Sequence, residues 1–99
     1  MKLYPGLLFM VREKTQPIRE SSDLTDTVKE LILYNDEVNT IDYVIESLIE
    51  VCEHDVYQAE TCAYVAHYNG KCPVKSGTFI DLKPKYNEMI RRGLTVDIE

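Results

Sequence analysis

The chain has 99 residues, which is enough for one domain with a modest hydrophobic core but too few for a deep active site between two lobes. Its formal net charge is −6, so nonspecific binding to nucleic acid is unfavourable and a cationic or amine-bearing partner is favoured. No run of the roughly 20 apolar residues that a membrane span needs is present, and no secretory signal is recognised. The expected compartment is therefore the cytoplasm, where thiols are kept reduced.

Residues 1–27 are predicted to form an N-terminal extension or linker, separate from a domain over residues 28–99. Within this extension, the apolar residues 7–11 predict either a short strand or a sticky tail. Residues 12–27 are polar and include Pro17, as is typical of a linker.

A strand is predicted over residues 28–34, where the chain is apolar and partly β-branched and stops at the turn formers Asn35 and Asp36. Asn39 is then expected to cap a helix, with Asp42 three residues later in the reciprocal position. Apolar residues follow at steps of three and four, which predicts a helical stripe comprising Ile41, Val44, Ile45, Leu48, Ile49 and Cys52.

A second helix is predicted to begin after the capping residue Asp55 and to end at Gly70, a typical C-terminal glycine. Its stripe contains mostly small residues, so this helix should pack closely on the first. His54, next to the cap, is expected to face solvent. The predicted buried stripe comprises Val56, Ala59, Cys62, Ala63 and Ala66.

The rest of the chain is predicted to contain a strand over residues 74–79, a helix, and a final strand over residues 94–98. Pro84 marks the approach to that helix, and Gly93 marks its end. The resulting order is β-α-α-β-α-β with short connections. We therefore expect an α+β sandwich, in which three helices pack on one three-stranded antiparallel sheet.

Hydrogen-bond acceptors gather where the first strand ends, at Asn35, Asp36 and Glu37. A plain turn also explains these residues, but loops between strand ends and helix starts commonly hold binding groups. His67 stands one turn from the end of the second predicted helix, where it can be either a favourable partner of the helix dipole or a ligand-binding imidazole. Together the two positions can surround a small cation, such as the free N-terminus of a peptide.

The three cysteines, Cys52, Cys62 and Cys72, are spaced too widely for the paired ligands typical of zinc sites. Cys52 and Cys62 fall on the apolar stripes, so buried thiols and no bound metal are expected. The sequence contains no glycine-rich phosphate loop and no Gly-x-Ser-x-Gly motif. We therefore predict a binding protein without catalytic activity, metal or cofactor.

Two short motifs resemble the ClpS family, the adaptors of Clp AAA+ proteases. Residues 33–45, with the sequence LYNDEVNTIDYVI, are similar to the family's L-x-N-D-D-x-T-P-M-E-F-V stretch. Residues 66–71, AHYNGK, resemble its V-H-x-x-G-K stretch. The spacing between the motifs also fits without a gap, and the resemblance covers about residues 28–99.

The resemblance implies recognition of N-degrons, in which an adaptor holds proteins that begin with a bulky hydrophobic residue and delivers them to a ClpA- or ClpC-type unfoldase. It also implies that Asn35, Asp36 and His67 bind the α-amino group and first peptide unit of the substrate. The pocket for the first side chain would lie between the first two helices. Its implied lining comprises Asn39, Ile41, Ala63 and Ala66.

The chain departs from the family pattern in the pocket and in the docking stretch. Ile41 replaces the family's gating Met, and Ala63 stands where a Met commonly lines the pocket. The family's docking stretch, T-x-E-x-A-E-x-K, is hard to recognise in residues 78–85. Two alternatives stay open: a divergent module that binds peptide termini without serving a protease, and a small oligomeric scaffold. The second follows from the element order, which also resembles the C-terminal domain of the ribosomal stalk protein.

Overall fold

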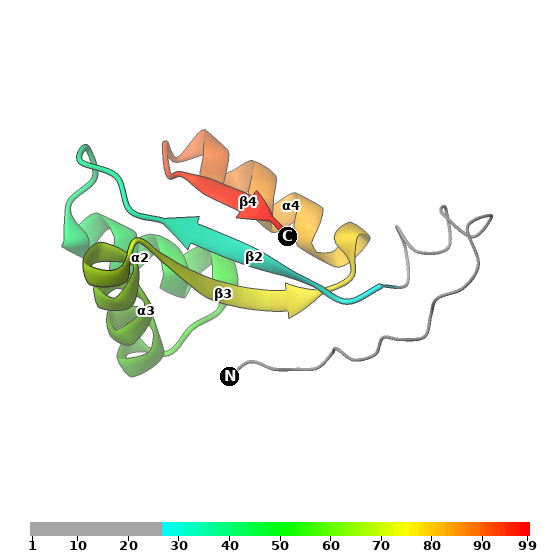
Figure 1. Cartoon of the computed structure of the whole chain (residues 1–99), viewed down its shortest axis with the longest axis horizontal. Coiled ribbons are helices and arrows are strands. Elements are labelled where there is room, and N and C mark those ends of the chain that lie inside the picture. The colour runs from blue at the N-terminus through cyan, green and yellow to red at the C-terminus, as the bar shows by residue number, and fades with distance from the viewer. Residues whose placement is uncertain (1–26) are drawn as a thin grey trace.

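The computed structural model describes residues 27–99, and this part of the chain forms a three-stranded sheet with three helices (Figure 1). The predictions for residues 1–26, a linker with a strand or tail over residues 7–11, lie outside the described residues. Within residues 27–99, no helix is both long enough and apolar enough to cross a membrane.

The helices and strands follow the predicted order, β-α-α-β-α-β. Strand β2 is central and pairs antiparallel with β3 on one side and β4 on the other, so the sheet order is β3-β2-β4. Helices α2 and α3 lie together at one end of the sheet, and α4 lies beside β4 (Figure 1). The elements are β2 (Lys29–Tyr34), α2 (Ile41–Cys52), α3 (Val56–Asn69), β3 (Lys71–Gly77), α4 (Phe79–Arg91) and β4 (Val96–Ile98).

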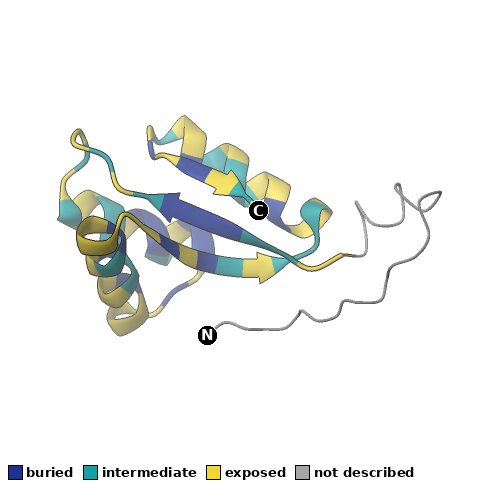
Figure 2. Ribbon diagram, in the orientation of Figure 1, coloured by how far each residue is buried: buried dark blue, intermediate teal, exposed yellow. Residues whose placement is uncertain are grey.

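The hydrophobic core lies between the sheet and the helices, and β2 is buried at Leu31, Ile32 and Leu33 and half-buried towards its ends (Figure 2). Leu31 and Leu33 of β2 share this core with Leu48 of α2 and Met89 of α4, and none of the four is more than 2% exposed. Full burial of one such side chain contributes about 1.5–3 kcal/mol. The predicted α+β architecture is therefore confirmed, with β2 as the strand on which the helices converge.

Helix α3 packs through its alanines, as its small residues predict. Ala59, Ala63 and Ala66 are at most 3% exposed and belong to the core. The predicted stripe was wrong at Val56, which is 58% exposed because it opens the helix at the margin of the packed face. Cys62, at the edge of the same stripe, is half-buried rather than buried.

Helix α2 begins one residue later than predicted, because Thr40 and not Asn39 is its N-cap. The Thr40 hydroxyl accepts a hydrogen bond from the backbone N–H of Tyr43 at 3.1 Å. The Asn39 side chain instead donates to Asp36 and to the carbonyl of Gly93. Asn39, which the sequence favoured as the cap, thus makes tertiary contacts instead of capping α2.

The boundary between β3 and α4 also differs from the prediction. Strand β3 starts at Lys71, directly after α3, because Lys71 pairs with Tyr34 of β2. It ends at Gly77, and Phe79 is the first residue of α4 rather than the last of a strand. The Thr78 side chain and Asp81 form a reciprocal capping box that starts the helix there, so Pro84 lies inside α4.

His54 is buried, contrary to the prediction that it faces solvent. Its side chain is 5% exposed, and its Nε2 atom lies 2.6 Å from the carbonyl oxygen of Val74 in β3. Because a carbonyl can only accept, Nε2 carries the proton and donates. The ring therefore ties the segment between α2 and α3 to the sheet.

Candidate functional site

A cavity of about 150 Å³ opens where β2 ends, between the loop that follows it and helices α2 and α3. Every residue predicted for the site lines this one cavity, although the two motifs are far apart in the sequence. The lining comprises Leu33, Tyr34, Asn35, Asp36, Glu37, Asn39, Ile41, Val44, Ala63, Ala66 and His67.

The end of α3 is joined to the loop after β2 by the backbone. The Asn35 N–H donates to the carbonyl of Gly70 at 2.9 Å, and Tyr34 pairs with Lys71 in the next register position. Gly70 has a φ of 100°, a left-handed conformation that glycine adopts without strain. The chain can therefore turn from α3 directly into β3 beside β2, and this turn brings His67 to the acidic loop.

The Asp36 carboxylate organises the loop between β2 and α2. Its Oδ1 atom accepts hydrogen bonds from the backbone N–H groups of Val38 at 3.0 Å and Asn39 at 2.9 Å. Its Oδ2 atom accepts from the Asn39 side chain at 3.0 Å. Partial burial acts to raise the pKa of Asp36, but hydrogen bonds from Asn39, Val38 and Thr95 outweigh it and hold the pKa below its ordinary value. The carboxylate is therefore a fixed negative charge at the cavity.

Asn39 connects this loop to the turn between α4 and β4. Its Nδ2 group donates both to Asp36 and, at 2.9 Å, to the carbonyl of Gly93, 54 residues away in the sequence. Thr95 adds a longer contact from its hydroxyl to Asp36 at 3.4 Å. The sequence analysis did not predict these contacts of Gly93 and Thr95, because no local pattern indicates a contact between segments so far apart.

Asn35 and His67 leave acceptors available at the cavity. The Asn35 side chain is exposed and makes no hydrogen bond to another described residue. The His67 ring is exposed in the last turn of α3 and packs edge-on against Tyr68, with 4.8 Å between ring centroids. Together with the charge of Asp36 and the negative end of the α3 dipole, these groups favour a cation over an anion.

The inner part of the cavity is apolar and is bounded by small side chains. Ala63 and Ala66 are almost fully buried on α3, and Ile41 and Val44 face them from α2. A cavity of this volume admits a group about the size of a benzene ring. The site therefore combines an acceptor-rich mouth with a space for one apolar side chain.

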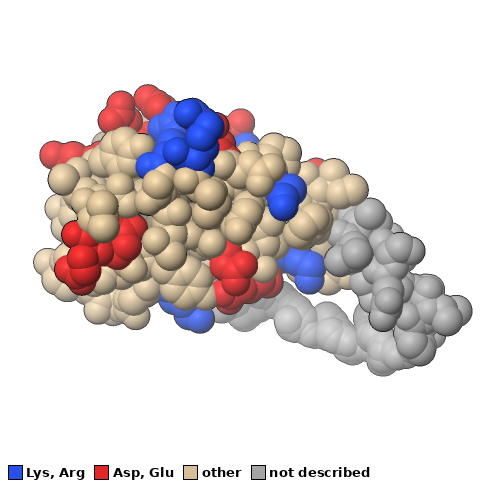
Figure 3. Space-filling model, turned by 90° about the horizontal axis from the view of Figure 1, so that it is seen from above, with Lys and Arg blue, Asp and Glu red and all other residues tan. Residues whose placement is uncertain are grey.

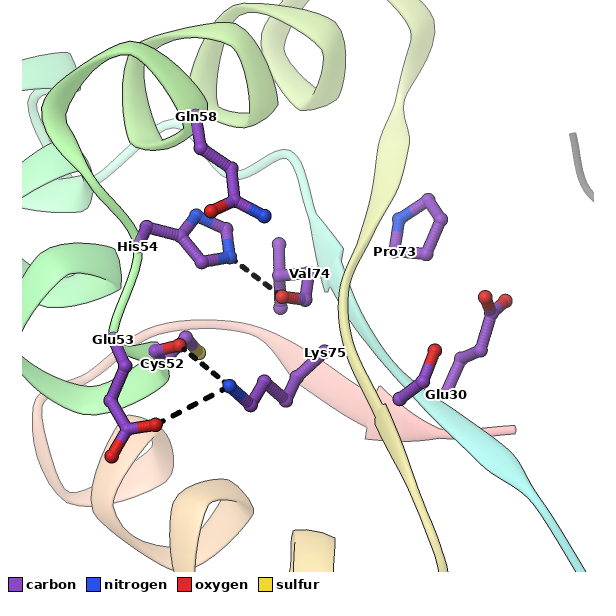
Figure 4. A pocket seen from close by; sticks show the side chains of 9 residues that line it. Glu30, Cys52, Glu53, His54, Gln58, Pro73, Val74 and Lys75 are labelled. Carbon is purple, nitrogen blue, oxygen red and sulfur yellow. Dashed lines mark hydrogen bonds and ion pairs between the residues drawn. The ribbon is translucent and has the colours of Figure 1, made fainter.

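A second hollow, of about 380 Å³, lies between the α2–α3 connection and β3 (Figure 4). Two of its polar side chains bond to neighbours: Lys75 donates to the carbonyl of Cys52 at 3.2 Å and to Glu53 at 3.4 Å, and His54 donates to Val74 through Nε2 (Figure 4). The Nδ1 atom of His54 is buried and has no hydrogen-bond partner among the described residues. None of the residues predicted for the site lines it. We therefore assign the candidate site to the smaller cavity.

Charged side chains on the face shown in Figure 3 form small acidic and basic groups separated by uncharged residues. This face of the described domain carries no broad basic surface of the kind that binds a nucleic-acid backbone. Among residues 27–99, no three His, Cys, Asp or Glu side chains converge as a metal site would require.

The ClpS family, described as the ATP-dependent Clp protease adaptor protein ClpS, matches residues 26–97. No curated protein matches the chain. Among solved structures, the fold is similar to Agrobacterium tumefaciens ClpS2 bound to L-phenylalaninamide, with a TM-score of 0.70 and 19% identity over 73% of this chain and 94% of that one. Because the family match spans most of the sequence, the chain belongs to the ClpS family of Clp protease adaptor proteins.

Proposed function

We propose that this protein is an N-degron adaptor, which binds the free N-terminus of proteins with a bulky hydrophobic first residue and delivers them to a ClpA- or ClpC-type unfoldase. Membership of the ClpS family supports this role. The observation that carries the binding step is the shared cavity, because every residue predicted for amine binding and for the side-chain pocket lines it. The adaptor leaves its substrate chemically unchanged and acts in the cytoplasm.

The amine of the substrate would sit at the mouth of the cavity. An α-ammonium group has three donors and one positive charge, and Asn35 and His67 offer acceptors for the donors. Asp36 already accepts from Val38 and Asn39, so it contributes mainly its fixed charge and a remaining acceptor position. Each charge-assisted hydrogen bond contributes about 1.5–3 kcal/mol, so loss of the amine should weaken binding strongly.

The first side chain of the substrate would enter the apolar part of the cavity, between α2 and α3. Asn39, Ile41, Ala63 and Ala66 are the residues that we assign to its lining. The Agrobacterium relative is bound to phenylalaninamide, which carries a free amine and a benzyl side chain. These are the two chemical features for which the present cavity has complementary groups.

The test is a titration of the full chain with two peptides that both start with Phe. They differ only in the α-amino group of this residue, which is free in one peptide and acetylated in the other. Acetylation removes the charge and two donors, so affinity should fall at least about 100-fold, or about 2.7 kcal/mol. Asp36→Ala and His67→Ala should weaken binding of the free peptide by a similar factor. Calorimetry or fluorescence anisotropy measures each affinity.

The control variant is Glu46→Ala, which removes an exposed acidic side chain of α2 that does not line the cavity. Its affinity for the free peptide should equal that of the native protein, and circular dichroism should show that all variants are folded. Equal affinities for the free and acetylated peptides would contradict the proposal, because a site that ignores the amine does not recognise N-termini. The scaffold alternative would then be favoured.

A further inference from the structure

Two cysteines of different elements approach one another beside the candidate site. Cys62 of α3 and Cys72 of β3 both direct their thiols to the same acceptor, the carbonyl oxygen of Pro73, at 3.9 Å and 3.4 Å. The distance between the sulfur atoms therefore cannot exceed the sum of these two lengths. Neither cysteine is part of a disulfide in this structure.

The two thiols differ in access and in acidity. Cys62 is half-buried, whereas Cys72 is 8% exposed. The side-chain interaction between the two thiols lowers the pKa of Cys62 and raises the pKa of Cys72. Cys62 is thus the more accessible sulfur and the one that loses its proton more easily, and Cys72 is a protonated partner beside it.

We propose that Cys62 and Cys72 form a reversible intramolecular disulfide when the protein meets a peroxide. The Cys62 thiolate attacks one oxygen of hydrogen peroxide, giving a sulfenic acid at Cys62 and hydroxide. The Cys72 sulfur then attacks the sulfenic sulfur, the S–S bond forms, and the hydroxyl group leaves with the Cys72 proton as water. The hydroxide takes up the proton that the Cys62 thiol released on ionisation. In total the two thiols lose two electrons, and the peroxide is reduced to two molecules of water.

The disulfide would act on the candidate site because its two ends adjoin the cavity lining. Cys62 directly precedes Ala63, and Cys72 is paired with Leu33 of β2; both Ala63 and Leu33 line the cavity. An S–S bond requires a distance of about 2.05 Å, so it would draw α3 towards the sheet. If the cavity binds N-termini as proposed above, this shift should narrow the pocket and weaken binding of a bulky first residue.

Peptide mapping tests the bond itself, without reference to binding. The folded full chain is treated with hydrogen peroxide, and the remaining free thiols are blocked with N-ethylmaleimide. Trypsin then cleaves after Lys71 and Lys75, and a protease specific for acidic residues cleaves after Glu53 and Glu60. This digestion places the three cysteines in separate peptides. A linked pair of residues 61–71 and 72–75, two hydrogens lighter than the free peptides and released by dithiothreitol, is the expected product.

Cys52→Ser is the matched control, because Cys52 is fully buried in α2 and burial raises its pKa to about 11. This variant should still form the linked pair, whereas Cys62→Ser and Cys72→Ser should not. A disulfide that includes Cys52, or Cys62 oxidised beyond the sulfenic acid while Cys72 stays free, would overturn the proposal. Because mapping of the native chain gives these outcomes directly, they do not depend on whether a variant folds.

The effect on the site is measured with phenylalaninamide as the probe. Oxidation should lower its affinity for the native protein about fivefold or more, and should leave the affinity of Cys62→Ser unchanged. An oxidised native protein that contains the linked pair yet binds as tightly as the reduced form would overturn the coupling to the cavity. Absence of binding by the reduced protein would contradict the proposed function instead, so the two failures are distinguishable.

Discussion

Asp36 accepts hydrogen bonds from two backbone amides and from the side chain of Asn39, so its carboxylate closes the loop between β2 and α2. The same carboxylate lines the candidate site, where it supplies negative charge. The Clp adaptor family that this chain belongs to was predicted partly from this residue, and the family is confirmed. The role of Asp36 as an amine ligand stays a prediction, whereas its role in the loop is visible in the structure.

The dual role of Asp36 predicts that the stability difference between the native protein and the variant Asp36→Asn depends on pH. Its pKa is depressed in the folded state, so the carboxylate stabilises the fold above the ordinary aspartate value of 3.8 and loses this effect as the pH falls below it. Asp36→Asn should therefore lower the melting temperature at pH 7. The NH2 group of the new amide would face the NH2 group of Asn39, and two donors cannot form a hydrogen bond with each other. The gap to the native protein should narrow below pH 3.8.

Thermal unfolding monitored by circular dichroism at several pH values checks this prediction. Glu60→Gln is the control for the loss of one negative charge, since Glu60 is exposed on α3 and makes no hydrogen bond to a described residue. A gap between Asp36→Asn and the native protein that is the same at pH 7 and at pH 3 would show that the carboxylate charge is not what stabilises the loop.

The size of the pocket residues predicts which first residue is preferred. Ala63 and Ala66 leave room on the α3 side, and Ile41 places a stiff β-branched side chain on the α2 side. Peptides that start with Phe, Tyr or Trp should bind at least as tightly as a peptide that starts with Leu. A series of four otherwise identical peptides measures this, and a tenfold preference for Leu, about 1.4 kcal/mol, would reverse the expected order.

At the scale of the elements, the helix ends are set by short-range side-chain contacts. Asp55 caps α3 by accepting from the N–H of Gln58 at 2.7 Å, and Gly70 ends the helix in a left-handed conformation, both as predicted. Helix α4 starts at a reciprocal capping box between Thr78 and Asp81. The box allows α4 to start before Pro84 and to run through it, even though that proline lacks one backbone donor.

Removal of the capping hydroxyl of α4 should destabilise the whole domain. Thr78→Ala loses the acceptor for the backbone N–H of Asp81, which costs about 1 kcal/mol, or about 4–8 °C in melting temperature for a domain of this size. Thr61→Ala is the matched control, since Thr61 is exposed inside α3. It should unfold at the same temperature as the native protein or slightly above it. Equal melting temperatures for the two variants would mean that the box does not hold the helix.

At the scale of the whole molecule, the candidate site and the stretch aligned with the family's docking pattern lie on different elements. The candidate cavity lies between β2, α2 and α3, whereas the aligned stretch begins at the N-cap of α4 and continues along that helix. There, Lys83 extends over the rings of Phe79 and Tyr86, at 5.7 Å and 5.3 Å from their centroids. Lys85 donates to the carbonyl of Val51 at 3.3 Å, so its charge is held against α2.

These features predict weak docking to an unfoldase N-domain of the ClpA type from a distant organism. Where the family pattern T-x-E-x-A-E-x-K has two acids, an alignment on Thr78 gives Ile80 and Lys83. Dissociation constants from calorimetry should lie well above about 1 μM, which corresponds to about 8.2 kcal/mol. The double variant Ile80→Glu, Lys83→Glu should bind more tightly than the native chain. Tight binding by the native chain, or no gain in the double variant, would contradict this account of docking.

The sequence by itself determined the order of elements, the fold class and the family, because each rests on patterns that are local along the chain. Apolar spacing gave the helices and strands, and short motifs after residue 33 and around His67 indicated the family. The same motifs indicated the residues that line one cavity in the structure. Such features can be predicted because hydrophobic periodicity and capping act between residues only a few positions apart.

Only the tertiary structure decided how Asn39, His54 and Cys62 are used. Asn39 does not cap α2 because its side chain bonds to Gly93, and His54 is buried because it bonds to Val74. The thiol of Cys62 contacts the carbonyl of Pro73, which Cys72 also contacts. Each of these contacts joins segments that are separated along the chain. The two segments come together only when the sheet has assembled. The packing of the folded domain then outweighs the local preference of the residue, which is why no sequence pattern indicated these roles.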